Sequence, residues 1–317
     1  PELGNLFAQC MAKQFQQILT GLESALILEL GAGTGSFCVD CMIALDALGC
    51  LPEKYYILEI SADLQQRQKQ KVKTLPEHLK QRIQWLSQPP INDFNGIVFA
   101  NEVVDALAVE VFKYEQHQFK QMRVHWEQEF KSSWQPMPTP LAQQLSAKNL
   151  QLDEGYVSEF IPHLSSWLLT VSKNLRKGLV LMVDYGYERS AYYHPQRNQG
   201  TLVCYHQHQA NFNYFSRIGI QDITAFVDFT ALAEAADDCG LSVDGYTTQS
   251  HLLMSLGIGE MLGDSENDYK NYYKKTTEMK KLTMPNEMGE KFKVMALSRD
   301  INTELRGFTF SNQLHLL

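Results

Sequence analysis

The chain has 317 residues, 44% of them hydrophobic and 20% charged, which is the composition of an ordinary globular protein with a large apolar core. Its formal net charge of −8 argues against a nucleic-acid partner, whose binding surface would show a basic stripe. The apolar stretches are far shorter than the roughly 20 residues that span a bilayer, so we predict no membrane insertion. The six cysteines lack the spacing of a disulfide framework, as expected in a reducing compartment.

The first predicted elements are an amphipathic helix within residues 1–22 and then a strand, a tight turn and a second helix. The strand is the apolar run Ala25–Leu28, which ends in the acid Glu29, and helical spacing resumes at Phe37. Between them the chain has glycine at alternate positions, namely Gly31, Gly33 and Gly35. Because glycine has no Cβ, such a turn admits positive φ and lets the backbone approach a ligand at the start of the helix. We therefore predict that a nucleotide-like cofactor lies on this turn.

Two classes of cofactor use a glycine turn of this kind, and the neighbouring residues distinguish them. A dinucleotide site has the pattern Gly-x-Gly-x-x-Gly/Ala, whereas Ser36 occupies the position of the third small residue here. The carboxylate of Glu29 would repel a pyrophosphate, but it suits the ammonium and sulfonium groups of S-adenosylmethionine (SAM). We therefore predict SAM as the cofactor, held by Glu29 and by the turn residues Gly31, Ala32, Gly33 and Gly35.

A second acidic strand end follows about two dozen residues after the glycines, as in a βαβ unit that binds a nucleotide. The apolar run Tyr55–Leu58 closes in Glu59 and Ile60. We predict that Glu59 accepts hydrogen bonds from both ribose hydroxyls and that Ile60 also contacts the cofactor; a solvated acid at a strand end is the alternative. A third strand, Ile83–Leu86, ends at Ser87, which we expect near the adenine in a doubly wound sheet.

A third group of polar residues follows the buried strand Ile97–Ala100. Asn101, Glu102 and Asp105 emerge at its carboxyl end, where ligands bind in open α/β sheets. If the segment turns helically, the carboxylates of Glu102 and Asp105 face one side, because they are three residues apart. The alternative is that Asn101 caps a helix with Glu102 in its first turn, and both roles are compatible.

The remaining chain combines strands and helices with long segments of little periodicity. We predict that a hairpin and the loop after it form an insertion over 109–140, that 187–229 forms irregular substrate-side loops, and that 250–285 is a helical insertion. In chain order the further predictions are a hairpin over 109–126, a proline-containing loop over 132–140, a helix over 162–175, a strand over 179–183, a helix over 229–236, and final strands over 241–248 and 292–297.

Two pairs of residues have the spacing of metal ligands, and we predict that neither binds a metal. Cys38 and Cys41 are three apart in the helix after the glycine turn, and His206 and His208 lie in the irregular segment. Each pair lacks a second group of ligands with suitable spacing. We expect the two cysteines to pack in the core instead.

The chain resembles the MidA family of class I SAM-dependent methyltransferases, whose mitochondrial members methylate protein arginines and assist assembly of respiratory complex I. The likeness covers nearly the whole chain and is carried by the blocks Glu29–Gly35, Asn101–Ala106, Asp184–Gly186, Gly200–Leu202, Asp222–Phe229, Thr248–Gln249 and Met288–Val294. The resemblance implies an α/β fold with a doubly wound, Rossmann-like sheet whose last strand is reversed. It implies a cytoplasmic location for a bacterial protein and the mitochondrial matrix for a eukaryotic one.

The residues predict SAM as the cofactor, and the resemblance implies one methyltransferase domain over 1–317 that transfers the methyl group of SAM to an arginine of a protein substrate. Carboxylates are needed to fix a planar guanidinium by paired hydrogen bonds, and Glu102 and Asp105 are the predicted catalytic residues. Asn101 is a further predicted cofactor-binding residue, in addition to those named above. The predicted substrate contacts come from Asp184, Tyr185, Tyr205, Asp222 and Thr224. A homodimer is compatible with these features. The alternative function is a SAM-binding assembly factor that acts as a scaffold through protein contacts.

Overall fold

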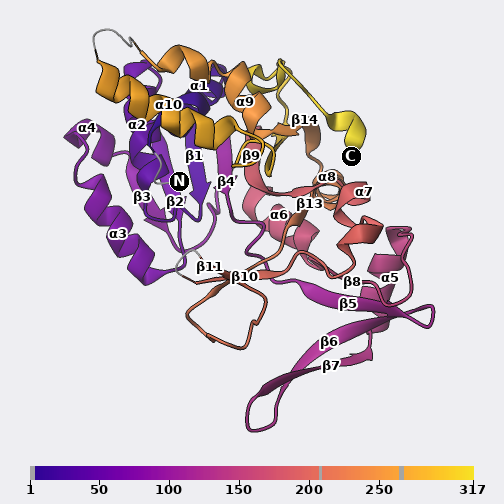
Figure 1. Cartoon of the computed structure of the whole chain (residues 1–317). Coiled ribbons are helices and arrows are strands. Elements are labelled where there is room, and N and C mark those ends of the chain that lie inside the picture. Colours follow the sequence, from indigo (N-terminus) through magenta and orange to yellow (C-terminus); the bar gives the residue numbers. More distant parts are fainter. Residues whose placement is uncertain (1–3, 207–208, 264–267) are drawn as a thin grey trace. The chain divides into compact units, whose positions relative to one another are not determined.

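The computed structural model of the protein describes residues 4–206, 209–263 and 268–317 (Figure 1). The chain divides into two compact units, each of which is built from separate stretches of sequence. The first unit comprises residues 1–103, 165–185 and 233–317, and the second comprises 104–164 and 186–232. The second unit therefore contains the segments predicted as the 109–140 insertion and as the 187–229 loops.

The first unit contains a mixed sheet whose strand order is that of a doubly wound fold. From one edge to the other its strands are β3 (Ile83–Leu86), β2 (Lys54–Leu58), β1 (Leu26–Leu30), β4 (Phe94–Asn101), β9 (Leu175–Tyr187), β15 (Phe292–Arg299) and β14 (Ser242–Thr248). The pairs from β3 to β9 are parallel, whereas β15 is antiparallel to both of its neighbours. The predicted fold and the reversed last strand are confirmed.

Helices lie between most successive strands of this sheet, since parallel strands need crossover connections, and one further helix precedes β1 and two short ones follow β15. They are α1 (Leu6–Leu19), α2 (Ser36–Ala47), α3 (Ala62–Val72), α4 (Glu77–Lys80), α6 (Leu164–Ser172), α8 (Phe229–Asp238), α9 (Gln249–Ser255), α10 (Tyr269–Thr283) and the short 3₁₀ helices η2 (Ile258–Met261), η3 (Arg306–Phe308) and η4 (Leu314–Leu316). Of these, α6 and α8 begin with residues of the second unit. None of the helices in the described part of the chain is both long and apolar enough to cross a membrane.

The core of the first unit lies on both faces of its sheet. Ile27 and Phe99 are fully buried in one cluster with Phe15 of α1, whose ring centroid is 5.5 Å from that of Phe99. Leu28 and Val98, the strand neighbours of Ile27 and Phe99, point to the opposite face and are also fully buried. Both faces of the central strands are therefore covered, which explains why these strands are continuous apolar runs in the sequence.

The second unit is built around a four-stranded antiparallel sheet with the order β7-β6-β5-β8. Its elements are β5 (Glu110–Glu115), β6 (Gln118–Trp126), β7 (Phe130–Pro136), α5 (Thr139–Ala147), β8 (Val157–Phe160), α7 (Arg189–Tyr192), η1 (Pro195–Arg197), β10 (Val203–His206), β11 (Gln209–Asn211), β12 (Asp222–Thr224) and β13 (Val227–Asp228). Strands β10, β11 and β12 form a separate antiparallel sheet, and β13 pairs with Gly186 and Tyr187 at the end of β9.

Three local predictions were wrong or incomplete, two of them in this unit and one at Glu102 of the first unit. The hairpin over 109–126 is present as β5 and β6, but 132–140 is not a loop, because β7 pairs with β6 and α5 follows. The segment 187–229 contains strands and short helices that the sequence did not predict. The helical turn after Glu102 is absent, since Glu102 has a left-handed backbone with φ +52° and no helix includes it.

Candidate active site

The glycine turn lies at the carboxyl edge of the sheet, between β1 and α2. All three glycines have positive φ, with values of +59° at Gly31, +52° at Gly33 and +82° at Gly35. The Gly31 amide donates to the Leu58 carbonyl at 3.0 Å, which ties the turn to the end of β2. A Cβ built on Gly33 meets no atom within 4 Å, so this part of the turn faces open space. The turn therefore offers a backbone surface that a ligand can approach, as the sequence predicted.

Glu29 is buried at the end of β1, directly before this turn. It lies opposite Ile57 on β2 and Phe99 on β4, and 3% of its surface is exposed. The Tyr55 hydroxyl donates a hydrogen bond of 2.9 Å to Oε2 of Glu29. Burial raises the pKa of Glu29 from 4.5 to about 8, the hydrogen bond from Tyr55 lowers it in part, and the charge of Glu59 raises it further. The Glu29 carboxyl is thus a group that exchanges its proton near neutral pH.

Glu59 lies just beyond β2, and its two carboxylate oxygens have different protein partners. Oε1 accepts from the Ser61 amide at 2.9 Å, and Oε2 accepts from Nε2 of Gln68 at 3.1 Å. The Glu59 side chain is buried, whereas the neighbouring Ile60 is 94% exposed. A carboxylate fixed in this way beside an exposed apolar side chain matches the two parts of a nucleoside, whose ribose is polar and whose base is flat and largely apolar.

Gln68 on α3 is the residue of this site that the sequence analysis missed. Its Nε2 also donates to the Gly33 carbonyl at 2.8 Å, and its Oε1 accepts from the Trp85 indole at 2.9 Å. The segment around it is rich in glutamine and lysine, a composition typical of an exposed helix, and Gln68 is not among the predicted site residues. A usable signal was present, since Gln68 is four residues from Leu64 and from Val72 and so shares their inward face.

The end of β4 holds the next group of predicted residues. The Glu102 amide donates to the Val183 carbonyl at 2.9 Å, and the Val103 amide donates to Oδ2 of Asp184 at 3.2 Å. Glu102 is half-buried, and its Oε1 accepts from Nδ2 of Asn101 at 3.3 Å. Asp184 is buried and uses its carboxylate to hold the backbone after Glu102, which is a positioning contact that the sequence did not reveal.

Tyr185 and Ser87 are two other predicted residues of the first unit. The Tyr185 amide donates to Oδ1 of Asp184 at 2.9 Å. The ring of Tyr185 packs on Phe292, with ring centroids 3.9 Å apart. Ser87 is exposed and, with Tyr56 and Trp85, lines a cavity of about 610 Å³. Ser87 is therefore near Trp85, the indole partner of Gln68.

The predicted residues of the second unit are described within that unit. Asp105 is buried, and its carbonyl accepts from the Ala225 amide at 3.1 Å. Tyr205 on β10 pairs with Asp222 on β12, and Thr224 pairs with Val203 on the same two strands. Tyr205, Asp222 and Thr224 thus share one small sheet, although Asp222 and Thr224 follow Tyr205 by 17 and 19 residues in the sequence.

The residues considered as metal ligands have structural roles or lie outside the described chain. Cys38 and Cys41 are both fully buried in α2, as predicted for core cysteines. Nδ1 of His206 is 2.7 Å from the Ile220 carbonyl, and His208 lies outside the described residues. Within the described residues, no three His, Cys, Asp or Glu side chains are grouped as metal ligands would be.

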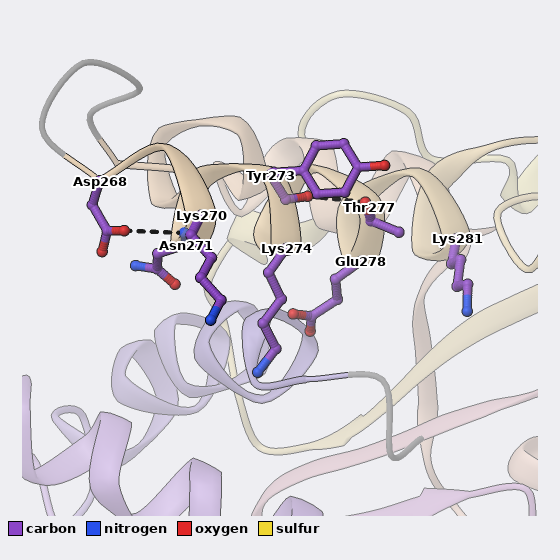
Figure 2. Close-up of a pocket in the computed structure, with 8 residues that line it drawn as sticks. All are labelled: Asp268, Lys270, Asn271, Tyr273, Lys274, Thr277, Glu278 and Lys281. Carbon is purple, nitrogen blue, oxygen red and sulfur yellow. Dashed lines mark hydrogen bonds between the residues drawn. The ribbon is translucent and has the colours of Figure 1, made fainter.

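A second cavity, of about 660 Å³, lies along α10 (Figure 2). Its lining comes from one helix and the residue before it: Asp268, Lys270, Asn271, Tyr273, Lys274, Thr277, Glu278 and Lys281. Figure 2 shows the carboxylate of Glu278 beside the lysine side chains. Oε1 of Glu278 accepts from the Leu6 amide at 2.8 Å and so joins α10 to the start of α1. None of the predicted site residues lines this cavity.

Comparison with protein families identifies the chain. A family model described as "Putative S-adenosyl-L-methionine-dependent methyltransferase" matches residues 6–247. The chain belongs to this family. The match includes the glycine turn, Glu29, Glu59 and the end of β4, so the family and the site coincide in sequence. The cofactor predicted from the residues, SAM, is the cofactor of the family, and the prediction of a methyltransferase is confirmed at this level.

Solved structures agree with the assignment to the SAM-dependent methyltransferases. An uncharacterized protein from Burkholderia thailandensis is 34% identical, with a TM-score of 0.94 over 100% of this chain and 85% of its own. A second Burkholderia thailandensis protein, which belongs to the same superfamily as the first, was crystallised with S-adenosyl-homocysteine. It is also 34% identical, with a TM-score of 0.94, and the match covers 100% of this chain and 82% of that protein. No curated protein matches the chain.

Proposed function

We propose that this methyltransferase binds SAM along the carboxyl edge of β1 and β2 and transfers the methyl group to an arginine of a protein. The observation that supports the binding mode is the arrangement of three features: Glu29, which accepts a hydrogen bond from Tyr55, and the glycine turn and Glu59, which Gln68 connects to each other by hydrogen bonds. The relative from Burkholderia thailandensis that holds S-adenosyl-homocysteine supports it further. In this mode Glu59 binds the ribose hydroxyls, Ile60 and Ser87 lie by the adenine, and Glu29 faces the ammonium group.

The residues present fit such a ligand. The space beside Gly33 is free of protein atoms within 4 Å of a Cβ position, so backbone contact is possible there. Each oxygen of Glu59 accepts a hydrogen bond from one protein donor and retains capacity for another. Burial raises the pKa of Glu29 because it disfavours the ionised carboxylate, and a cationic group beside Glu29 would stabilise that ionised form.

The proposed acceptor is the guanidinium of an arginine, and the proposed catalytic residues are Glu102 and Asp105. Glu102 supports this role because it is not glycine and yet has a left-handed backbone, which costs free energy and is typical of functional positions. The hydrogen bond from the Val103 amide to Asp184 helps to hold that conformation. When bound, SAM supplies the methyl group. The protein must hold the acceptor nitrogen about 3 Å from the methyl carbon and orient the guanidinium by paired hydrogen bonds.

The experiment incubates the protein with labelled SAM and a lysate from cells lacking it, followed by mass spectrometry of each labelled band. We expect label on arginine, and we expect Glu102→Gln and Asp105→Asn each to lower transfer at least 100-fold while SAM binding persists. The matched control is Glu53→Gln, which changes an exposed carboxylate in the same way. Transfer that survives both site substitutions would refute the proposed roles, and label on another residue type would refute the acceptor.

A second candidate function is partner binding in the assembly of a respiratory complex, which the resemblance to the MidA family suggests. The observation in its favour is an apolar face on the β6–β7 ribbon of the second unit. Val124, Trp126, Phe130 and Trp134 are exposed there, and the rings of Trp126 and Phe130 are 5.0 Å apart. Exposed apolar patches of this kind mark protein contacts, including contacts with a second copy of the chain.

The two functions differ in what their variants change. Trp126→Ser with Phe130→Ser should abolish capture of a partner, or a dimer in light scattering, and leave SAM binding intact. If those substitutions eliminate the biological activity while Glu102→Gln does not, the scaffold function is correct and the enzyme is not.

A further inference from the structure

Gln68 is a fully buried amide on a helix that is otherwise mostly polar and exposed. Buried side-chain amides cost free energy unless their hydrogen-bonding groups have partners. In Gln68 both ends of the amide have them: Nε2 donates to the Gly33 carbonyl and to Glu59, and Oε1 accepts from Trp85. The position of this side chain is therefore specified by three separate elements of the first unit.

The orientation of the Gln68 amide follows from chemistry. The indole N–H of Trp85 can donate and cannot accept, so the oxygen of Gln68 must face it. The amide NH₂ then faces the Gly33 carbonyl and the Glu59 carboxylate, both of which are acceptors. A rotated amide would place its oxygen against two acceptors and its NH₂ against a donor.

This orientation determines which parts of Glu59 are available to a ligand. Each carboxylate oxygen can accept two hydrogen bonds. Ser61 uses one site on Oε1 and Gln68 uses one site on Oε2, which leaves one site on each oxygen. Two equivalent acceptors on one rigid carboxylate match the two adjacent hydroxyls of a ribose.

The same amide also fixes the glycine turn. Its second N–H holds the Gly33 carbonyl, and the Gly35 Cβ position lies 3.2 Å from the Cα of Gln68. Gln68 thereby sets the position of Glu59 relative to the turn, although none of its polar groups is needed for direct contact with a ligand.

We propose that Gln68 is a positioning residue for the ribose subsite, acting through Glu59. This inference rests on the proposed ribose role of Glu59. It predicts that loss of the Gln68 amide weakens recognition of the ribose hydroxyls and leaves recognition of the rest of the cofactor largely unchanged.

Calorimetry with S-adenosylhomocysteine and with its 2′,3′-dideoxy analogue tests this. In Gln68→Met, which keeps the side-chain length and removes the amide, we expect affinity for S-adenosylhomocysteine to fall about tenfold. Affinity for the dideoxy analogue should change less than twofold, so the ratio of the two affinities falls at least fivefold. The matched control, Gln70→Met on the exposed side of α3, should keep the wild-type ratio. Equal weakening of both ligands, or no weakening, would overturn the proposal, because a general structural defect does not distinguish ribose hydroxyls.

Two further variants keep the test decisive. Trp85→Phe removes the donor that orients the Gln68 amide, so it should lower the affinity ratio by about two- to fivefold even if Gln68→Met does not fold. In Glu59→Gln the ratio should also collapse, and adding Gln68→Met should lower it less than twofold more. A collapse in Glu59→Gln with an unchanged ratio in Gln68→Met refutes the role of Gln68 alone. An unchanged ratio in Glu59→Gln refutes the ribose role itself, and neither outcome depends on the methyl acceptor.

Discussion

The hydroxyl of Tyr55 donates a 2.9 Å hydrogen bond to the buried carboxyl of Glu29, and the two side chains come from neighbouring parallel strands. Burial raises the pKa of Glu29 to about 8, and the hydrogen bond from Tyr55 offsets part of that rise by stabilising the ionised form. Glu29 therefore carries a proton in most molecules at neutral pH. Because it lies directly before the glycine turn, its ionisation and the binding of a cationic group are linked.

The first prediction follows from this linkage. A ligand ammonium beside Glu29 favours the carboxylate, so binding of S-adenosylhomocysteine should release close to one proton per molecule at pH 7. Affinity should rise by about tenfold per pH unit between pH 5 and 7, well below the raised pKa, and less steeply as the pH approaches 8. Calorimetry in buffers of different ionisation enthalpy measures the proton count. Glu29→Gln should bind without proton release, Glu53→Gln should behave as the wild type, and binding without proton release in the wild type would contradict the prediction.

The second prediction concerns stability and pH. The pKa of Glu29 is about 8 when folded and 4.5 when the group is in water, so the folded state binds the extra proton between these values. The contribution to stability is complete below pH 4.5 and is lost as the pH rises through 8. The free energy of unfolding should fall by about 1 kcal/mol per pH unit across this window, and Glu29→Gln should remove that component. Urea unfolding at pH 6 and pH 8.5 measures this change in the free energy of unfolding. If the wild type and Glu29→Gln showed the same change between the two pH values, the assignment to Glu29 would be wrong.

The third prediction tests the close approach of β1 and β4 at the start of β1, at the end of the strand away from the glycine turn. A Cβ on Gly96 would lie 2.0 Å from the Leu26 carbonyl oxygen, and that atom is backbone, which cannot move aside independently. Gly96→Ala should therefore lower the free energy of unfolding by about 3 kcal/mol or more. The control is Gly21→Ala, where the nearest atom is at an ordinary 3.6 Å. A Gly96→Ala protein with wild-type stability in urea would be inconsistent with this strand pairing.

The fourth prediction concerns the second unit, where Glu159 is a buried carboxylate. Its Oε1 accepts from the Tyr192 hydroxyl at 2.9 Å and from the Thr201 amide at 2.8 Å. Tyr192→Phe removes one donor and should cost about 1–2 kcal/mol. Hydrogen exchange should increase around residues 192–201, and the exposed Tyr273→Phe serves as the control. Unchanged exchange in this segment would mean that the Tyr192 contact does not order it.

Local features of the sequence were sufficient to predict the parts of the site that depend on backbone chemistry. Glycine at positions 31, 33 and 35 is required by positive φ, and this requirement is visible in the sequence because other residues rarely adopt such conformations. Glu29 and Glu59 follow apolar runs that form parallel strands, so their place at one edge of the sheet follows from strand direction. The order of these elements predicted the fold and the cofactor.

Other features depend on contacts between residues distant in sequence. The segment around Trp134 has polar neighbours and prolines, and it is a strand because β6 supplies its hydrogen bonds. The backbone after Glu102 is held by Val183 and Asp184, which lie about 80 residues later, and those contacts replace the helical turn expected from local spacing.

The sequence by itself determined the strand, turn and helix that carry the glycines and the two acids, because backbone dihedral limits and hydrophobic periodicity act over a few residues. The tertiary structure alone decided that Gln68 is buried between Gly33, Glu59 and Trp85. A glutamine on a polar helix is stable in water, and it becomes a structural link only where the fold supplies two acceptors and a donor within hydrogen-bonding distance.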